Sequence, residues 1–263
     1  MPFREQNSNK GTFGKVLNFC GSKNYIGAAY FSVVSSLKVG AGYSALASSK
    51  DVIQSVSKLL PEAVFLTSED GLKRLQEFSV ILIGCGIGQD SEAENLLKKV
   101  LLKVENKPVI IDADGLNILS KIKIHLPQNT IITPHPAEAA RLLKTSTENV
   151  LKDLESSAKK LSEKYNCVTV LKTHRTVICN KDLIIHINEH GNSALAKAGS
   201  GDVLAGIIAG LIAQGMDLFE GAKLGVYLHS RTGEIASEEL SEYSVLASDI
   251  IKYIHLSIKE IAH

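Results

Sequence analysis

Residues 198–202, Ala-Gly-Ser-Gly-Asp, form a loop of small residues that leads directly into the apolar segment 203–208. Glycine has no Cβ, so backbone N–H groups in such a loop can approach a ligand closely. If the apolar segment is a helix, its first N–H groups lack intrahelical acceptors and lie at the positive end of the helix dipole. The pattern predicts a binding site for a phosphate or a developing oxyanion, with the Asp202 carboxylate beside it.

Asp202 has two interpretations. An aspartate at the start of a helix is commonly an N-cap, which stabilises the helix by about 1 kcal/mol. A cap does not need three small residues before it, however. The Gly-Ser-Gly run therefore favours an anion-binding loop with a carboxylate base next to it.

Two further glycine-rich loops follow expected strands. Residues 84–88, Gly-Cys-Gly-Ile-Gly, come after the apolar run 80–83, and residues 21–29 come after another apolar run. The first is not the full dinucleotide-binding fingerprint, because Gln89 and Asp90 interrupt it, and tight turning explains it equally well. Ligands of open α/β sheets bind at the carboxyl ends of the strands. Three such loops therefore predict a site for an extended, phosphorylated ligand.

Acidic and histidine side chains follow two other expected strands. Asp112 and Asp114 have several possible roles there, namely helix capping with loop bracing, hydrogen bonding to a ribose, or help in holding Mg²⁺. His135 lies between two prolines, which fix its backbone and thereby the direction of its side chain. A structural and a functional role of His135 stay equally open. Glu138, one helical step further on, is a candidate for binding Mg²⁺ through water.

Residues 172–176, Lys-Thr-His-Arg-Thr, connect two expected strands. They form either a solvated charged turn or a cationic loop beside a nucleotide phosphate or adenine. Residues 188–192 precede the small-residue loop and are interpreted as its scaffold. The sequence contains no Walker A, H-E-x-x-H or G-x-S-x-G pattern. The residues alone thus indicate an α/β enzyme that handles phosphorylated ligands.

Short apolar runs alternate with longer helical patterns along the chain. The expected strands are 15–20, 42–47, 80–83, 109–112, 130–133, 168–171, 176–179 and 183–187. The expected helices are 25–38, 50–59, 91–103, 114–120, 137–143, 148–165, 202–214, 219–240 and 247–261. Continuous apolar strands between helices predict a mainly parallel sheet covered on both faces, and a hairpin around 180–182 makes it mixed. No repeat or linker composition interrupts the pattern, so we expect one domain over residues 1–263.

Composition narrows the class of protein. The 263 residues are 44% hydrophobic and 22% charged with a formal net charge of +1, which gives no sign of a nucleic-acid or membrane partner. The longest strongly apolar stretch, 203–213, is too short to cross a bilayer. Cys20, Cys85, Cys167 and Cys179 have no Cys-x-x-Cys spacing, so we expect buried thiols in a reducing cytoplasm.

Several of these motifs, taken in order, resemble those of the ADP- or ATP-dependent NAD(P)H-hydrate dehydratases, a family of the ribokinase-like superfamily. The resemblance covers nearly the whole chain, from about residue 9 to residue 254. The matching segments are Lys-Gly at 10–11, Gly-Lys-Val-Leu at 14–17, Gly-Ser at 21–22, Gly-Ala-Ala at 27–29, Asp-Ala-Asp-Gly-Leu-Asn at 112–117, Thr-Pro-His-Pro-Ala-Glu at 133–138, Gly-Ser-Gly-Asp-Val-Leu-Ala-Gly at 199–206 and Ala-Ser-Asp at 247–249. This resemblance implies a ribokinase-like α/β fold, a homotetramer and a role in metabolite repair.

The resemblance also assigns roles to individual residues. The positions that match the binding site for the hydrated nicotinamide nucleotide are Ala28, Gly86, His135 and Asp202. The positions that match the adenine-nucleotide site are Lys172, Thr173, His174, Arg175, Thr176, Gly199, Ser200 and Gly201. Asp202 matches the catalytic carboxylate of the family, and Mg²⁺ is implied together with ADP or ATP as co-substrate, ADP being favoured. A separate NAD(P)H-hydrate epimerase is expected as a functional partner.

Several positions depart from the family pattern. Asn9 replaces a frequent histidine, Cys85 replaces the proline of a Gly-Pro-Gly turn, and Thr173 replaces the glycine of a Lys-Gly pair. Lys197 and Ala198 stand where the family has Thr-Gly. We expect Thr173 to restrict close approach of the nucleotide to the backbone. We also expect Ala198 to narrow the anion-binding loop and Lys197 to add a charge near the phosphate.

The implied reaction is dehydration of the S form of NAD(P)H hydrate. Hydroxide is a poor leaving group and phosphate is a good one, so Asp202 is expected to take the proton of the C6 hydroxyl while the oxygen attacks the terminal phosphate of the nucleotide. Elimination of phosphate then restores NADH or NADPH. Two other functions stay open, namely a kinase of a small alcohol, such as a sugar or vitamin precursor, and a non-catalytic nucleotide sensor.

Overall fold

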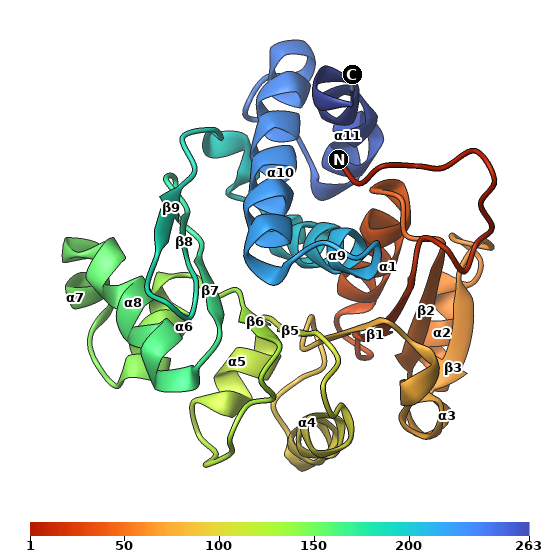
Figure 1. Cartoon of the computed structure of the whole chain (residues 1–263), viewed down its shortest axis with the longest axis horizontal. Helices are drawn as coiled ribbons and strands as arrows, with labels where there is room; N and C mark the ends of the chain where they lie inside the picture. Colours follow the sequence, from red (N-terminus) through yellow and green to blue (C-terminus); the bar gives the residue numbers. More distant parts are fainter. Residues whose placement is uncertain (263) are drawn as a thin grey trace.

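The nine strands of the computed structural model, which describes residues 1–262, belong to one sheet (Figure 1). In chain order the strands are β1 (Lys15–Phe19), β2 (Tyr43–Ser48), β3 (Val64–Thr67), β4 (Val80–Ile83), β5 (Val109–Ile111), β6 (Thr130–Ile132), β7 (Val168–Leu171), β8 (Val177–Cys179) and β9 (Ile185–Ile187). Their order across the sheet is β3-β2-β1-β4-β5-β6-β7-β8-β9. Strands β2 and β3 therefore lie on one side of β1, and strands β4 to β9 follow in order on its other side.

The pairing of the strands makes the sheet mixed. All pairs from β3 to β7 along the sheet are parallel, whereas β7 with β8 and β8 with β9 are antiparallel. Strands such as β4, which is buried at every residue, have the continuous apolar sequence of strands covered on both faces. The predicted mainly parallel, mixed α/β sheet is confirmed.

Helices cover both faces of the sheet (Figure 1). One face packs against α1 (Ile26–Lys38), α2 (Lys50–Val56), α9 (Ser200–Ala213), α10 (Leu218–Leu240) and α11 (Ala247–Ile261). The other face packs against α3 (Ser68–Lys73), α4 (Ser91–Lys103), α5 (Asp114–Leu119), α6 (Pro136–Leu143), α7 (Thr147–Lys152) and α8 (Leu154–Tyr165). Two 3-10 turns, η1 (Leu75–Glu77) and η2 (Ser193–Leu195), complete the elements. Side chains alternate along each strand, so Val16 packs in the first layer and Leu17 in the second.

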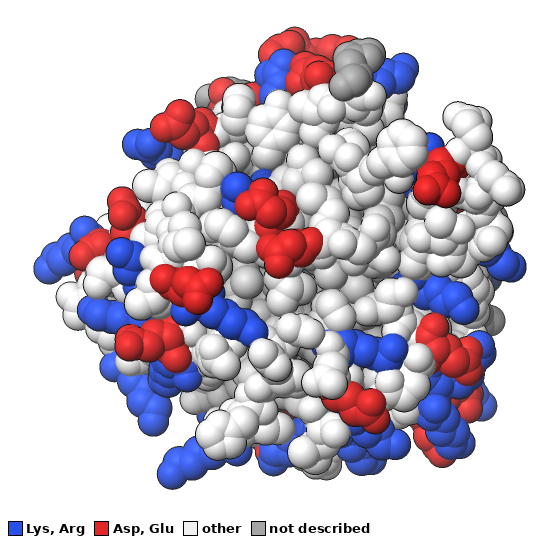
Figure 2. All heavy atoms as spheres, in the orientation of Figure 1, with Lys and Arg blue, Asp and Glu red and all other residues white. Residues whose placement is uncertain are grey.

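Most charged side chains lie on the surface, whereas the thiols lie inside. Acidic and basic side chains are next to one another over much of the face shown in Figure 2. All four cysteines are free and buried, as the sequence predicts. Among the described residues, no helix has both the length and the apolar character needed to span a membrane.

Two parts of the chain differ from the expectation. Segment 64–73 forms β3 and α3, which are not predicted, because β3 is a short, half-buried edge strand and Gly71 interrupts the helical pattern. Gly71 packs so closely that a Cβ there would lie 2.6 Å from the Cβ of Ala47. The single helix expected over 148–165 is wrong. It divides into α7 and α8 because Asp153 leaves the helical conformation and caps α8.

Candidate active site

The candidate site lies at the carboxyl edge of the parallel strands, where the strand order reverses between β1 and β4. The loops after β1, β4, β5, β6 and β7 reach this edge together, because these strands are parallel. The N-terminus of α9 meets them there, since a Cβ on Gly201 would lie 3.5 Å from Lys172 Nζ and 3.9 Å from Asp112 Oδ2. The fold thus joins loops that are far apart in the sequence.

The first turn of α9 offers hydrogen-bond donors. Gly199 precedes the helix with φ of +89°, a left-handed conformation that favours glycine. The N–H group of Ser200 donates to the carbonyl of Lys197 at 3.2 Å. Within residues 1–262, the N–H groups of Gly201 and Asp202 have no protein acceptor. The Gly199 N–H group also has no acceptor among the described residues, so the free donors at this end of α9 are those of Gly199, Gly201 and Asp202, whereas the Ser200 N–H group is already used.

Asp202 is the third residue of α9 and not its N-cap, so the capping interpretation is wrong. Its carboxylate, the Asp112 carboxylate and the Cys85 thiol have atoms that all lie within 4.8 Å of one another. Burial raises the pKa of Asp202 to about 7, and the charge of Asp112 acts in the same direction, while Cys85 and Lys172 oppose the shift. A carboxyl group whose pKa is near neutral pH is suited to act as a general base.

Asp112 is buried at the centre of the charged groups. Its Oδ1 accepts hydrogen bonds from Lys172 Nζ at 2.6 Å and from Thr133 Oγ1 at 2.7 Å, and its Oδ2 accepts one from Cys85 Sγ at 3.7 Å. Burial acts to lower the pKa of Lys172, but the charges of Asp112 and Glu138 outweigh it and leave this pKa raised. Lys172 therefore stays protonated and places a cation beside the first turn of α9.

The loop after β7 has an inward and an outward part. Lys172 points toward Asp112, whereas His174 and Arg175 are exposed. Thr173 N–H donates to Thr176 Oγ1 at 3.4 Å, and Thr176 Oγ1 donates to the Thr173 carbonyl at 3.0 Å. The threonines therefore close the turn, and Lys172 is the member of this loop that the structure brings to the charged centre.

His135 and Glu138 form a capping box at the start of α6. His135 N–H donates to Glu138 Oε2 at 2.9 Å, and the ring Nδ1 accepts from Ala137 N–H at 3.2 Å. The ring Nε2, which then carries the proton, lies 3.3 Å from Glu138 Oε1. Burial raises the pKa of Glu138 to about 7, and burial followed by the charge of Lys172 lowers the pKa of His135. The half-exposed ring is thus oriented by its own loop as well as by the flanking prolines.

Ala28 and Gly86 lie next to each other. Ala28 is in the first turn of α1, and Gly86 is in the loop after β4 with φ of +64°. A Cβ on Gly86 would lie 2.9 Å from the Cβ of Ala28 and 2.6 Å from that of Tyr25. The structure therefore brings together two residues that the resemblance assigns to the nicotinamide nucleotide.

Cys85 is the site residue that sequence reasoning missed. The sequence predicts only a buried thiol, and burial is confirmed, but Sγ also donates to Asp112. The hydrogen bond with Cys20 and burial raise the pKa of Cys85, so the thiol stays neutral. The available signal is its position between two glycines at the end of a strand, where ligands of α/β sheets bind.

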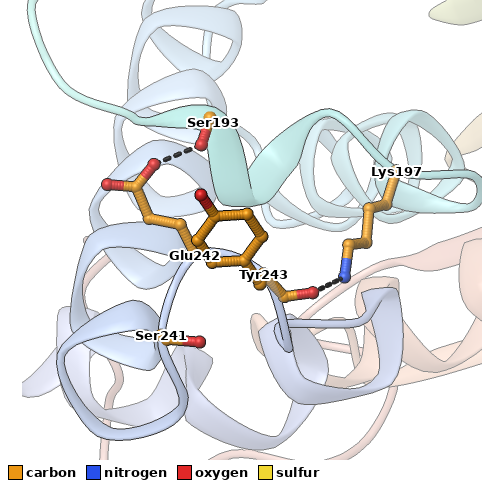
Figure 3. A pocket seen from close by; sticks show the side chains of 5 residues that line it. All are labelled: Ser193, Lys197, Ser241, Glu242 and Tyr243. Atoms are coloured by element: carbon orange, nitrogen blue, oxygen red, sulfur yellow. Dashed lines mark hydrogen bonds between the residues drawn. The ribbon is translucent and has the colours of Figure 1, made fainter.

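A surface pocket adjoins the small-residue loop near α10 and α11 (Figure 3). Its lining residues are Ser193, Lys197, Ser241, Glu242 and Tyr243. The ammonium group of Lys197 donates to the carbonyl of Tyr243, and the hydroxyl of Ser193 donates to the carboxylate of Glu242 (Figure 3). In this structure Lys197 therefore ties the α10–α11 connection to the loop, and a charge of Lys197 near the phosphate stays a prediction.

Known proteins that resemble the chain point to one family. The family model for NAD(P)H-hydrate dehydratase matches residues 16–256. The chain belongs to this family. It is 37% identical over 241 residues to the ADP-dependent (S)-NAD(P)H-hydrate dehydratase of Neisseria meningitidis serogroup B, covering 89% of this chain and 81% of that protein. The family predicted from the sequence motifs is confirmed.

Solved structures agree with this dehydratase fold. The ADP/ATP-dependent NAD(P)H-hydrate dehydratase from Bacillus subtilis, co-crystallized with ATP and Mg²⁺, has a TM-score of 0.89 and 31% identity, covering 99% of this chain and 94% of that chain. A ribokinase-like superfamily protein from Enterococcus faecalis V583 has a TM-score of 0.90 and 30% identity, covering 98% and 91%. The curated relatives also include bifunctional NAD(P)H-hydrate repair enzymes, of which the chain spans about half the length. The predicted ribokinase-like fold is confirmed.

Proposed function

We propose that the protein is a nucleotide-dependent dehydratase that repairs (S)-NAD(P)H hydrate, with ADP favoured over ATP. One observation carries the proposal, namely that the Asp202 carboxylate lies in the same helical turn as the free N–H groups of Gly201 and Asp202. Transfer of a phosphoryl group to a hydroxyl needs a base and an anion-binding site at one point. Family membership and the nucleotide dependence named for the relatives support the substrate class and the co-substrate.

The two ligands would occupy opposite sides of the site. The nicotinamide nucleotide would lie on Ala28, Gly86 and His135, a placement supported by the close contact of the first two residues. The adenine nucleotide would place its terminal phosphate at the first turn of α9, next to Lys172. Support for this placement comes from the free N–H groups and from the cation that Asp112 holds at 2.6 Å.

The reaction then follows from the charges of the site. Asp202 accepts the proton of the C6 hydroxyl, the oxygen bonds to the terminal phosphorus, and the bond from phosphorus to the leaving nucleotide breaks, which yields AMP from ADP or ADP from ATP. The N–H groups of Gly201 and Asp202 and the Lys172 ammonium stabilise the charge of the transferring group. Departure of phosphate from C6, with loss of a proton from the neighbouring carbon, restores the reduced nicotinamide ring.

Glu138 is the proposed holder of Mg²⁺, through water. Mg²⁺ prefers carboxylate and water oxygens, and the donor set around Glu138 fits because this carboxylate and that of Asp112 are both buried at the same edge of the sheet. When bound, the ion would neutralise charge on the nucleotide phosphates.

The decisive experiment is a turnover assay. The protein is incubated with NADH hydrate, Mg²⁺ and either ADP or ATP, and absorbance at the reduced-nicotinamide band is followed. We expect absorbance to return with nucleotide and not without it, and we expect AMP and phosphate as products with ADP. Full-rate dehydration without nucleotide would contradict the proposal. A stable phosphorylated product would favour a small-alcohol kinase, and tight nucleotide binding without turnover would favour a sensor.

Four further expectations stay predictions. These are a homotetramer, a cytoplasmic location, a single domain over residues 1–263 and a separate NAD(P)H-hydrate epimerase as functional partner. The bifunctional character named for several relatives supports a second repair activity that acts alongside this one. Native mass spectrometry of the purified protein tests the tetramer directly.

A further inference from the structure

His229 on α10 is buried against the first turn of α9. Its Nε2 lies 3.0 Å from Ser200 Oγ, and the two residues are 6% and 4% exposed. His229 and Ser200 are 29 positions apart, and no local sequence pattern links them. This hydrogen bond therefore joins the anion-binding turn to a second helix.

The pair is built to hold position and not to exchange protons. Burial lowers the pKa of His229 to about 4, with the backbone of Ser200 acting in the opposite direction, so the ring is neutral around pH 7. The Ser200 hydroxyl is buried beside the ring, whereas the following two residues, Gly201 and Asp202, have free N–H groups. A buried polar pair of this kind favours one arrangement, because a buried donor or acceptor that loses its partner is costly.

Ser200 carries a side chain that links the start of the turn to α10. It lies between Gly199 and Gly201, which have no side chains, and Gly199 has φ of +89°. Glycine adopts many backbone conformations, so this segment would otherwise be free to vary. The direction of the N–H groups of Gly201 and Asp202 therefore depends on how Ser200 is held.

We propose that His229 is a positioning residue, which acts through the Ser200 hydroxyl to hold the N–H groups of Gly201 and Asp202 in the direction that transfer of the phosphoryl group requires. The inference rests on the proposed function, since it names a support for the same phosphate site. Misplacement of reacting or stabilising groups by about 1 Å can cost on the order of 10² in rate. Ground-state binding of the nucleotide, which many contacts share, is affected much less.

The test compares two substitutions at one position. His229→Leu fills similar space but leaves Ser200 without a partner, whereas His229→Gln can place a polar atom near the position of Nε2. We expect His229→Leu to lower kcat on the order of 10²-fold while KM for the nucleotide changes less than about threefold. We expect His229→Gln to recover most of the lost kcat. Ser200→Ala is the second variant, should His229→Leu not fold, and it is expected to reproduce the fall in kcat.

Thr232→Val provides the matched control. Thr232 lies three residues further along α10, is fully buried and bonds to Ser257 Oγ at 2.7 Å, but it does not touch the phosphate turn. We expect Thr232→Val to lower Tm about as much as His229→Leu does, with kcat within about twofold of wild type. A comparable fall in kcat for both variants would show a general structural effect and overturn the inference.

An amide NMR spectrum gives a readout that does not depend on turnover. In the absence of ligands, the Gly201 and Asp202 amide signals should shift in His229→Leu and stay close to their wild-type positions in Thr232→Val. Unshifted signals, or a folded His229→Leu with wild-type kcat, would remove the positioning role. Failure of the proposed function is distinguishable, because the wild-type protein would then show no nucleotide-dependent conversion of NADH hydrate.

Discussion

The two glycine-rich loops 199–202 and 84–88 look alike in sequence but are built differently. The first leads directly into α9, and within the described residues the N–H groups of Gly199, Gly201 and Asp202 have no acceptor. After the second, α4 begins only at Ser91, and the Gly88 N–H donates to Asp114 Oδ2 at 2.9 Å. The first loop thus presents donors to a ligand, whereas the second satisfies at least one of its donors within the protein.

The glycines of the two loops also have different surroundings. A Cβ on Gly84 would lie 2.0 Å from the Asp112 carbonyl oxygen, and a Cβ on Gly86 would lie 2.6 Å from the Cβ of Tyr25. A Cβ on Gly201 would meet no described atom closer than 3.5 Å. Glycine therefore permits close packing in one loop and leaves room for a ligand in the other, a difference that composition alone does not reveal.

The largest expected effect on kcat is at Asp202, in loop 199–202. Asp202→Asn removes the base, so kcat should fall on the order of 10² to 10⁴-fold. Nucleotide affinity should hold or improve, because a negative charge beside the phosphates is removed. Steady-state kinetics with NADH hydrate and calorimetry with ADP measure the two effects. Near-wild-type turnover would end the catalytic assignment.

Asp217→Asn is the matched control for this substitution. Asp217 caps α10 by accepting hydrogen bonds from Phe219 N–H and Glu220 N–H, and asparagine caps about as well as aspartate. We therefore expect kcat and Tm close to those of wild type. A large loss of activity in Asp217→Asn would show that kcat in this chain responds to helix capping in general.

Asp202 also predicts opposite pH dependences for activity and stability. Its pKa in the folded protein, about 7, lies above the ordinary value of 3.8. The base is therefore protonated below about pH 7, and wild-type kcat/KM should fall there. The ionised carboxylate destabilises the fold increasingly between about pH 4 and pH 7, so Asp202→Asn should raise Tm by several degrees at pH 8 and by little at pH 4. An unchanged or lower Tm of the variant at pH 8 would contradict the raised pKa.

Gly84→Ala, in loop 84–88, is expected to lower the stability of the protein. Gly84 has φ of +122°, and the new Cβ would clash with backbone, so the free energy of unfolding should fall by about 3 kcal/mol or more. Thermal unfolding measures the effect. Gly215→Ala is the control, because Gly215 has φ of +92° but no atom near its Cβ position, and its loss should be about 1 kcal/mol. If Gly84→Ala and Gly215→Ala lowered the free energy of unfolding equally, the backbone around Gly84 must move to relieve the clash.

Gly201→Ala, in loop 199–202, should lower the affinity for the nucleotide and leave the stability nearly unchanged. The new methyl group meets no atom closer than 3.5 Å and the backbone has no positive φ, so Tm should stay within about 2 °C of wild type. It would project into the space assigned to the phosphate, so affinity for ADP should weaken roughly tenfold, or about 1.4 kcal/mol. Titration calorimetry and thermal unfolding of the same sample separate the two outcomes. Unchanged affinity of Gly201→Ala for ADP would contradict the placement of the phosphate at the first turn of α9.

His135→Ala is expected to have the smallest effect. The ring is half exposed, and His135 is one of the positions assigned to the nicotinamide nucleotide, so hydrate binding should weaken several-fold while ADP affinity is kept. Competition binding measures the affinity of the variant for the hydrate and for ADP separately. His255→Ala, at an exposed position of α11, serves as the control and should change neither affinity. Loss of ADP binding in His135→Ala, with hydrate binding kept, would show that His135 belongs to the adenine-nucleotide site.

Much of the fold could be predicted because its signals are local. Continuous apolar strands, alternating helices and glycine turns specify a parallel sheet without reference to distant residues. The edge strand β3 was not predicted, because four half-buried residues carry little periodicity. The break at Asp153 was also missed, since a cap within a helical pattern is visible only once α7 and α8 pack separately.

The site could be predicted only where one segment carries it. The loop around Asp202 combines small residues and a carboxylate within five positions, so its chemistry is visible in the sequence. The pair of Lys172 with Asp112 spans 60 positions, and the bond of His229 to Ser200 spans 29, so both depend on the fold. The helix begins at Ser200 and not at Asp202 as expected, so the Ser200 N–H group is used within the protein and the Asp202 N–H group is free.

Helices α1 and α9 touch where α9 has no side chains. A Cβ on Gly206 would lie 2.0 Å from Ser35 Oγ, and a Cβ on Gly210 would lie 2.5 Å from the Ser36 carbonyl oxygen. Because α1 carries Ala28 and α9 carries Gly201 and Asp202, the spacing of these residues depends on a helix contact only about one to two turns further along α9. A side chain at Gly206 or Gly210 would therefore push α1 and α9 apart and change the position of Asp202 relative to Ala28, although neither glycine belongs to the candidate site.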